Sequence, residues 1–176
     1  MKRIKLGMIG GGIGAFIGDA HRRASRICNS YTLEGGVFNA DYDKSKEFAI
    51  QENIDLSRVY PGVEEFVKGE LSLPVDERIE AVSIVTPNHL HYAHAKMLLE
   101  NDFHVICEKP VTMTLVEAEE LKSIVEKTGK VFCLTHTYAG YPMVRQMREL
   151  IKQGVAGDIQ RVDAQYYQGW VCNKVC

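Results

Sequence analysis

The fold of this chain is indicated most strongly by residues 4–15, which spell IKLGMIGGGIGA. Residues 4–9 are mostly apolar and predict a buried strand, and residues 15–25 predict the helix that follows it. Glycines dominate the junction between them. Because glycine adopts positive φ angles at little steric cost, these residues predict a sharp strand-to-helix turn.

The turn matches the G-x-G-x-x-A pattern of dinucleotide-binding loops, with Ala15 at the third position. Without Cβ atoms the backbone can approach a pyrophosphate, and the N–H groups at a helix start attract its negative charge. A tight turn without a ligand is the competing interpretation, and the position at the first strand favours the ligand. The residues assigned to the pyrophosphate are Gly10, Gly11, Gly12, Ile13 and Gly14.

The rest of the chain alternates between strand-like and helix-like stretches, which predicts a parallel sheet covered by helices. The expected strands are 32–38, 81–85, 103–107 and 131–134, and the expected helices are 44–53, 63–68, 91–100, 114–127 and 143–152. Residues 69–78 are expected to form a loop. Thr114 and Glu117 fit a capping box, and Gly129 fits the end of that helix. The predicted class is therefore α/β, a Rossmann-type doubly wound parallel sheet.

Two domains are expected. Residues 1–136 form the dinucleotide-binding Rossmann domain, and residues 137–176 form a crossover helix and the first strand of an incomplete α+β domain. Residues 157–169 predict that strand, although nothing after it is long enough to pair with it. We therefore expect a truncated or frameshifted chain, and an exposed C-terminal strand that can support a homo-oligomer.

Composition narrows the classes of partner. The chain has 176 residues, with 21 Lys and Arg against 23 Asp and Glu, so its formal net charge is −2. This balance gives no basic surface for nucleic acid or an anionic membrane. The apolar run at residues 6–18 is shorter than the 18 or more residues that a membrane span requires. Five cysteines do not form a disulfide framework, so a cytoplasmic protein is expected.

The end of the second strand is where a dinucleotide site places an acid for the ribose hydroxyls, about 20 residues beyond the glycines. Here Asn39 lies at the strand tip and Asp41 follows two residues later. Lys44 and Lys46 are close enough in sequence to meet the 2′-phosphate of NADP. The choice between NAD and NADP stays open, with a slight preference for NAD because no arginine occurs there.

Polar loops also follow the strands 81–85 and 103–107. The first loop runs Thr86, Pro87, Asn88, His89, Leu90, His91, and the second runs Glu108, Lys109, Pro110. Open parallel sheets bind ligands at the carboxyl ends of their strands, so both loops should face a shared cleft. The Lys109 ammonium is able to hydrogen-bond a reacting hydroxyl or carbonyl, although an ordinary solvated lysine is the alternative.

Taken in this order and spacing, the glycine turn, Thr86-Pro87-Asn88 with His91, and Glu108-Lys109-Pro110 resemble the Gfo/Idh/MocA family of NAD(P)-dependent oxidoreductases. The resemblance covers about residues 5–167. It implies hydride transfer between a sugar- or inositol-like polyol and nicotinamide.

The same resemblance implies the role of each residue. Thr86, Pro87 and Asn88 line the cofactor groove, His91 steadies that loop, and Glu108 bonds near the nicotinamide ribose. Lys109 is the catalytic residue that contacts the substrate hydroxyl, and the bond before Pro110 is often cis. His136 lies near the nicotinamide.

Family members are about twice this length, and their second domain carries an Asp and a His that complete proton transfer. A non-catalytic dinucleotide-binding module is therefore the alternative function. A metal site among His89, His91 and His94 is conceivable, but no carboxylate or cysteine completes a tetrahedral ligand set. No metal is expected.

Overall fold

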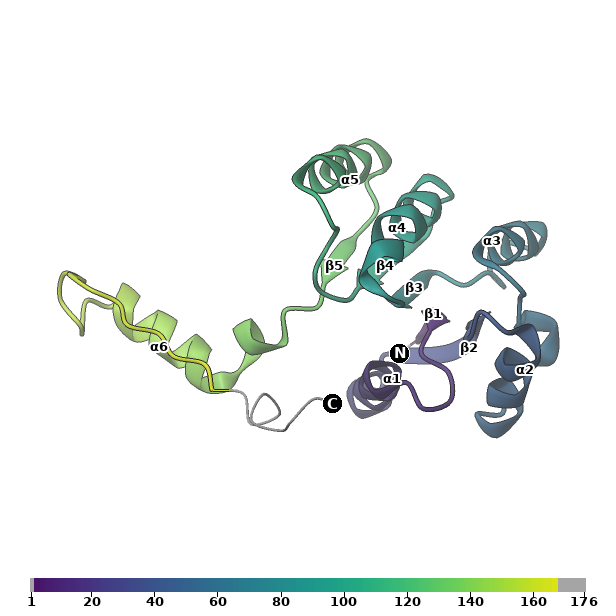
Figure 1. Cartoon of the computed structure of the whole chain (residues 1–176), viewed down its shortest axis with the longest axis horizontal. Helices are drawn as coiled ribbons and strands as arrows, with labels where there is room; N and C mark the ends of the chain where they lie inside the picture. Colours follow the sequence, from purple (N-terminus) through teal and green to yellow (C-terminus); the bar gives the residue numbers. More distant parts are fainter. Residues whose placement is uncertain (1, 168–176) are drawn as a thin grey trace, which may run out of the picture. The chain divides into compact units, whose positions relative to one another are not determined.

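The computed structural model describes residues 2–167. The chain divides into two compact units, residues 1–136 and residues 137–176. The first unit holds a parallel sheet with five helices (Figure 1). Its strands are β1 Ile4–Gly10, β2 Tyr31–Val37, β3 Ala81–Val85, β4 His104–Cys107 and β5 Phe132–Leu134. Its α-helices are α1 Phe16–Cys28, α2 Tyr42–Gln51, α3 Val63–Ser72, α4 His91–Glu100 and α5 Leu115–Thr128. The predicted Rossmann-type α/β class is confirmed.

The strand order is β2-β1-β3-β4-β5, and every neighbouring pair is parallel. One further bridge joins Val59 to Gly36 of β2, also parallel, at the outer edge of β2. Val59 lies between the short 3₁₀ helix η1 Leu56–Arg58 and α3. Counted as a strand, it gives the order 3-2-1-4-5-6, which is the usual order of dinucleotide-binding Rossmann sheets. The third strand of that order is thus reduced here to a single bridge.

Helices cover both faces of the sheet, with α3, α4 and α5 on one face and α1 and α2 on the other (Figure 1). Alternate residues of the strands point to opposite faces of the sheet and pack into two separate hydrophobic cores. Ile9 and Ile84 belong to the core under α3, α4 and α5, whereas their neighbours Met8 and Val85 belong to the core that contains Phe48 of α2. Burial on both faces explains why the central strands are continuous apolar runs.

Local capping residues set both ends of helix α5. The Thr114 hydroxyl accepts the Glu117 N–H, and the Glu117 carboxylate accepts the Thr114 N–H, so the predicted capping box is present. Gly129 ends the helix with a φ of +67°.

No helix within residues 2–167 is both long and apolar enough to cross a membrane.

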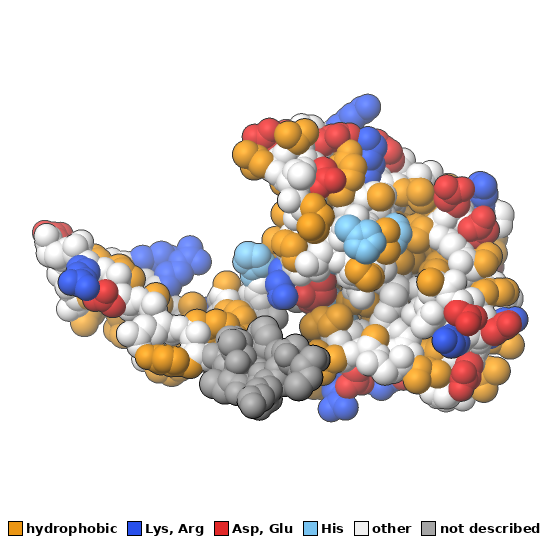
Figure 2. Space-filling view, viewed as in Figure 1, with side chains coloured by type: hydrophobic (Ala, Val, Ile, Leu, Met, Phe, Trp, Pro, Cys, Tyr) orange, Lys and Arg blue, Asp and Glu red, His pale blue; other side chains and the backbone are white. Residues whose placement is uncertain are grey.

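The second unit contains the 3₁₀ helix η3 Thr137–Gly140 and α6 Pro142–Lys152. Helix α6 exposes Met143, Val144, Met147, Leu150 and Ile151, and hydrophobic side chains are prominent on this unit in Figure 2. The strand expected at 157–169 is wrong for the described part of it, since residues 157–167 form none. Extended residues become a strand only when a neighbour pairs with them, and no such neighbour lies among the described residues. Residues 168 and 169 of the expected strand, and the residues after it, lie outside the described part of the chain.

The expected loop at residues 69–78 is also wrong at its start, because α3 continues to Ser72. Glu70 is the reason. It is fully buried, and its carboxylate accepts hydrogen bonds from the Arg58 guanidinium at 2.6 and 2.9 Å, the Tyr60 hydroxyl at 2.8 Å and the Ile79 N–H at 2.9 Å. Burial and the hydrogen bond to Glu70 raise the pKa of Tyr60 to about 12. One buried acid therefore joins α3 to both flanking segments.

The substitution Glu70→Ala should lower the free energy of unfolding by about 3–5 kcal/mol, because the half-buried Arg58 loses its nearest carboxylate and keeps only Glu34, at 3.9 Å. Urea denaturation measures the change. Glu64→Ala, in the exposed first turn of the same helix, is the matched control and should change stability by less than about 1 kcal/mol. Equal losses in the two variants would contradict the role given to Glu70.

Candidate nucleotide-binding edge of the sheet

The glycine turn lies at the carboxyl end of β1, where backbone segments approach too closely for side chains. Gly10 and Gly11 have φ angles of +84° and +77°. A Cβ atom on Gly12 would lie 2.7 Å from the carbonyl oxygen of Phe38, and one on Gly18 would clash with the Cα of Gly11. These contacts pack α1 tightly on the turn and explain the spacing of the glycines.

The start of α1 is open. Ala15 occupies the N-cap position, and no side chain caps the helix. The first N–H groups of a helix lack partners within it, so uncapped ones are available to an anion. Beside them lies a cavity of about 310 Å³. It is lined by residues 12–16, by Asp19 and Arg22 of α1, by Phe48 and Gln51 of α2, and by Glu52 directly after α2. Nothing lies within 4 Å of the position that a Cβ of Gly14 would take.

A buried arginine supports the turn from within. The Arg22 guanidinium donates to the carbonyl oxygen of Gly11 at 2.5 Å and lies 4.8 Å from the ring centre of Phe48. It also lies 3.5 Å from the Glu52 carboxylate and 3.8 Å from that of Asp19. Arg22 was not predicted from the sequence. Its spacing of four residues from Gly18, which places both residues on the buried face of α1, was the available signal.

The end of β2 is adjacent to the turn, because the Gly12 N–H donates to the Phe38 carbonyl at 2.9 Å. Asn39 follows, and its side-chain oxygen accepts the Asp41 N–H at 2.9 Å. Asp41 itself is exposed and caps α2 by accepting the N–H groups of Asp43 and Lys44. Asn39 thus directly follows Phe38, which contacts the glycine turn, whereas the Asp41 carboxylate already serves as the N-cap of α2.

The loops after β3 and β4 are joined by one buried side chain, His91. Its Nδ1 lies 2.7 Å from the Pro110 carbonyl oxygen, and its Nε2 lies 3.0 Å from that of Thr86. Both partners accept only, so a neutral ring donates to one at a time and a protonated ring donates to both. Thr86 also lies close to the glycine turn, since a Cβ atom added to Gly10 would lie 3.2 Å from the Thr86 Cγ2. Both ring nitrogens are occupied, which removes His91 as a metal ligand.

Glu108 and Lys109 follow β4 at the same edge. Glu108 is buried, and its N–H donates to the Ile84 carbonyl of β3 at 3.0 Å. Its carboxylate accepts from the Lys109 N–H at 3.2 Å, and His21 of α1 lies 2.9 Å from its other oxygen. The Lys109 side chain is exposed, and the Lys109–Pro110 bond is cis. His21 was not found by sequence analysis.

The remaining candidates are more exposed. Pro87 and Asn88 lie at the start of the short helix η2 Asn88–Leu90, and His136 lies two residues after β5. Neighbouring strands are ~4.8 Å apart, so candidates at the ends of β2 and β5 are separated by four steps, or ~19 Å. The sheet thus presents a row of sites along its carboxyl edge, from Asn39 to His136.

Other chemistries fit this edge poorly. Burial raises the pKa of the Cys107 thiol to about 12, which removes it as a nucleophile. Within residues 2–167 no group of three or more His, Cys, Asp and Glu side chains is placed to hold a metal ion. A phosphate-bearing ligand fits better, because the turn combines close backbone approach, an uncapped helix start and a cavity beside both.

Comparison with known proteins decides the family. The sequence profile of an oxidoreductase family with an NAD-binding Rossmann fold, Gfo/Idh/MocA, matches residues 4–136. The chain belongs to this family. The expected resemblance is therefore confirmed, and the matched range contains the glycine turn and the loops that hold His91 and Lys109.

Individual members are similar over most of this chain. The uncharacterized oxidoreductase YfiI of Bacillus subtilis is 39% identical over 170 residues, which make up 96% of this chain and 43% of that protein. The scyllo-inositol 2-dehydrogenase (NADP(+)) IolW of the same species is 30% identical over 143 residues, or 77% of this chain and 39% of that protein.

A crystal structure of an inositol dehydrogenase homolog from Azotobacter vinelandii, complexed with NADH and myo-inositol, is similar with a TM-score of 0.86 and 37% identity. The match covers 89% of this chain and 41% of that one. The chain spans less than half the length of these relatives.

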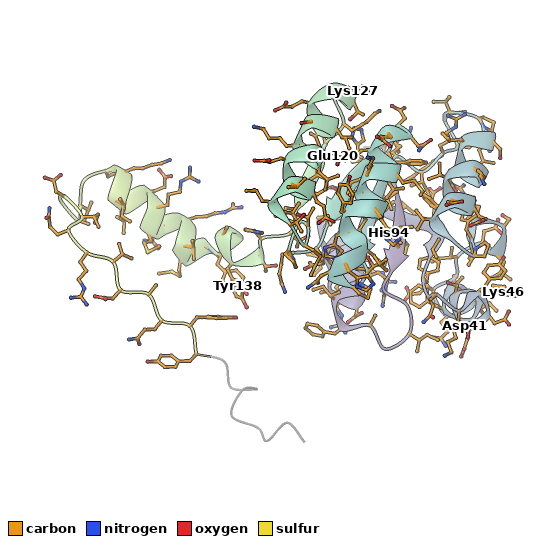
Figure 3. All side chains as sticks on the ribbon, turned by 45° about the horizontal axis from the view of Figure 1, so that its top comes forward. Asp41, Lys46, His94, Glu120, Lys127 and Tyr138 are labelled. Carbon is orange, nitrogen blue, oxygen red and sulfur yellow. The ribbon has the colours of Figure 1, made fainter. Side chains whose placement is uncertain are left out.

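The substitution His91→Leu should lower the free energy of unfolding by about 2–4 kcal/mol, because it removes the buried donor that the Thr86 and Pro110 carbonyls share. His94→Leu on the same helix is the matched control (Figure 3). The Nδ1 of His94 is buried and has no hydrogen-bond partner among the described residues, so its loss should cost less than about 1 kcal/mol. Urea denaturation of both variants tests this, and the reverse ranking would contradict it.

Acid should weaken the folded chain through His94. Burial lowers the pKa of His94 below its usual 6.5, and the neighbouring His91 and His89 act in the same direction. The unfolded chain then binds the proton more readily, so stability present above pH 6.5 is lost as the pH falls below it. The fall in unfolding free energy between pH 7 and pH 5.5 should be smaller in His94→Leu than in wild type. Parallel pH profiles would refute this assignment.

Proposed function

We propose that this chain binds a nicotinamide dinucleotide along the carboxyl edge of its sheet, as the cofactor-binding part of a dehydrogenase that acts on a sugar- or inositol-like polyol. The observation that carries the proposal is the meeting of the open glycine turn with the loops of Thr86 and Glu108 at one edge. Membership of an NAD-binding family and the inositol ligand of a similar structure support it.

In this proposal the pyrophosphate is held by the backbone of Gly10 to Gly14 and the start of α1. Thr86, Pro87, Asn88 and His91 form and steady the groove wall, and Glu108 and His136 border the nicotinamide end. A bound nicotinamide would supply the hydride acceptor. Lys109 is the catalytic residue: its exposed ammonium hydrogen-bonds the substrate hydroxyl and stabilises negative charge that develops on that oxygen.

NAD is the preferred cofactor. The two lysines near the end of β2 already have acidic partners: Lys46 lies 2.6 Å from the Asp43 carboxylate and 4.5 Å from the ring centre of Tyr42, and Lys44 lies 4.0 Å from Asp41. Asp41, the N-cap of α2, and Lys46 of the same helix are labelled near each other in Figure 3. A 2′-phosphate would have to compete with these carboxylates for the lysines and would be repelled by them.

One other candidate function is a dinucleotide-binding module without turnover of its own. The chain spans 39–43% of the relatives described above. In this alternative the same edge binds the dinucleotide, and Lys109 has no substrate to act on.

A fluorescence titration with NADH and a turnover assay with NAD and a panel of polyols separate the two functions. If the chain acts as part of a dehydrogenase, Lys109→Ala should lower turnover at least about 100-fold while the Kd for NADH changes less than about threefold. Binding of NADH with no polyol oxidised by the wild type would favour the module. Absence of NADH binding would overturn both.

The cofactor preference has its own test. NADH should bind the wild type about tenfold more tightly than NADPH, and Asp43→Asn should narrow this gap by freeing Lys46. Glu47→Gln, which removes one negative charge from an exposed position of the same helix, is the matched control and should narrow it less. Tighter binding of NADPH by the wild type would refute the preference.

A further inference from the structure

A chain of hydrogen bonds crosses from α1 to the end of β4 beneath the candidate site. His21 of α1 lies between two partners: its Nδ1 is 2.8 Å from the Ser83 hydroxyl of β3, and its Nε2 is 2.9 Å from Oε1 of Glu108. The second oxygen of Glu108 accepts the Lys109 N–H at 3.2 Å. Ser83 and Glu108 are buried, and the side chain of His21 is 12% exposed.

The chemistry of the partners gives these bonds one direction. A carboxylate only accepts, so Nε2 of His21 donates to Glu108. A neutral ring then has a lone pair on Nδ1, and the Ser83 hydroxyl, which can both donate and accept, donates to it. Glu108 therefore selects the tautomer of His21 that carries its proton on Nε2, and Ser83 complements this tautomer by donating its hydroxyl proton to Nδ1.

The arrangement has the residue types of a hydrolytic triad, but it does not have the access. A nucleophilic serine must reach its substrate, and Ser83 is 1% exposed in the middle of the central strand β3. The chain of bonds instead ends at the buried Glu108, whose neighbour Lys109 is exposed. His21 therefore acts on Glu108 at the candidate site and does not activate Ser83 as a nucleophile.

We propose that His21 is a positioning residue that fixes the Glu108 carboxylate at the cofactor-binding edge. The inference rests on the dinucleotide-binding function proposed above. With one oxygen held by His21 and the other by the Lys109 N–H, the plane of the carboxylate is set before a ligand arrives. Because α1 also begins at the glycine turn, one helix orients both ends of the site.

Two variants of His21 and a double variant test the proposal by NADH titration. His21→Leu removes both hydrogen bonds and should raise the Kd for NADH roughly tenfold. His21→Gln keeps a donor for Glu108 and an acceptor for Ser83, so it should restore most of the affinity. Since His21 acts through Glu108, His21→Leu combined with Glu108→Gln should bind no more weakly than Glu108→Gln alone.

His104→Gln, at the amino end of the same strand β4, is the matched control and should leave the Kd unchanged. Nitrogen-15 NMR of the wild-type ring gives a readout independent of the variants, and it should show His21 protonated at Nε2. An unchanged Kd in a folded His21→Leu, additive effects in the double variant, or a ring unprotonated at Nε2 would overturn this inference alone. Failure of the wild type to bind NADH would overturn the proposed function and this inference with it.

Discussion

The close approach of backbone to backbone at the glycine turn is the constraint on which the rest of the structure depends. Gly12 packs on the Phe38 carbonyl and Gly18 packs on Gly11, so the first strand, the first helix and the end of the second strand meet without intervening side chains. Arg22 then holds the turn through the Gly11 carbonyl. This packing leaves the start of α1 uncapped and facing a cavity, which is the feature a phosphate needs.

Buried polar side chains connect the other loops at the carboxyl edge of the sheet by hydrogen bonds. His91 binds the backbone of the loops after β3 and β4, whereas His21 binds the side chains of Ser83 and Glu108. Loops at the end of a parallel sheet are otherwise connected only through their strands. Two histidines thus link separate strand ends. The exposed Lys109 lies between Glu108, which His21 contacts, and Pro110, which His91 contacts.

Local signals explain how much of this could be predicted from the sequence. The limits of β3 and α4 agree with the predicted 81–85 and 91–100, and the capping box at Thr114 is present, because apolar runs and helix caps act over a few residues. The glycine turn was found for the same reason. The strand expected at 157–169 was wrong in its described part because pairing depends on a neighbouring strand that sequence periodicity does not report.

The polar network was missed for a different physical reason. Glu108 and His21 are 87 residues apart in sequence, and Ser83 and His21 are 62 apart. A histidine or serine in a helix or strand looks the same in sequence whether it faces solvent or a distant partner. Glu70 has the same character, since all four groups that donate to its carboxylate belong to Arg58, Tyr60 and Ile79, which lie outside α3 on both sides. Its burial extended that helix beyond the expected limit.

The central claim is that a dinucleotide lies against the turn between β1 and α1. The most direct measurement is a ¹H–¹⁵N correlation spectrum of the backbone amides during titration with NADH. The account predicts that the largest shifts fall on residues 11–16, with further shifts in the loops at 86–91 and 108–109. Large shifts confined to other parts of the chain, with the amides of 11–16 unmoved at saturation, would contradict it.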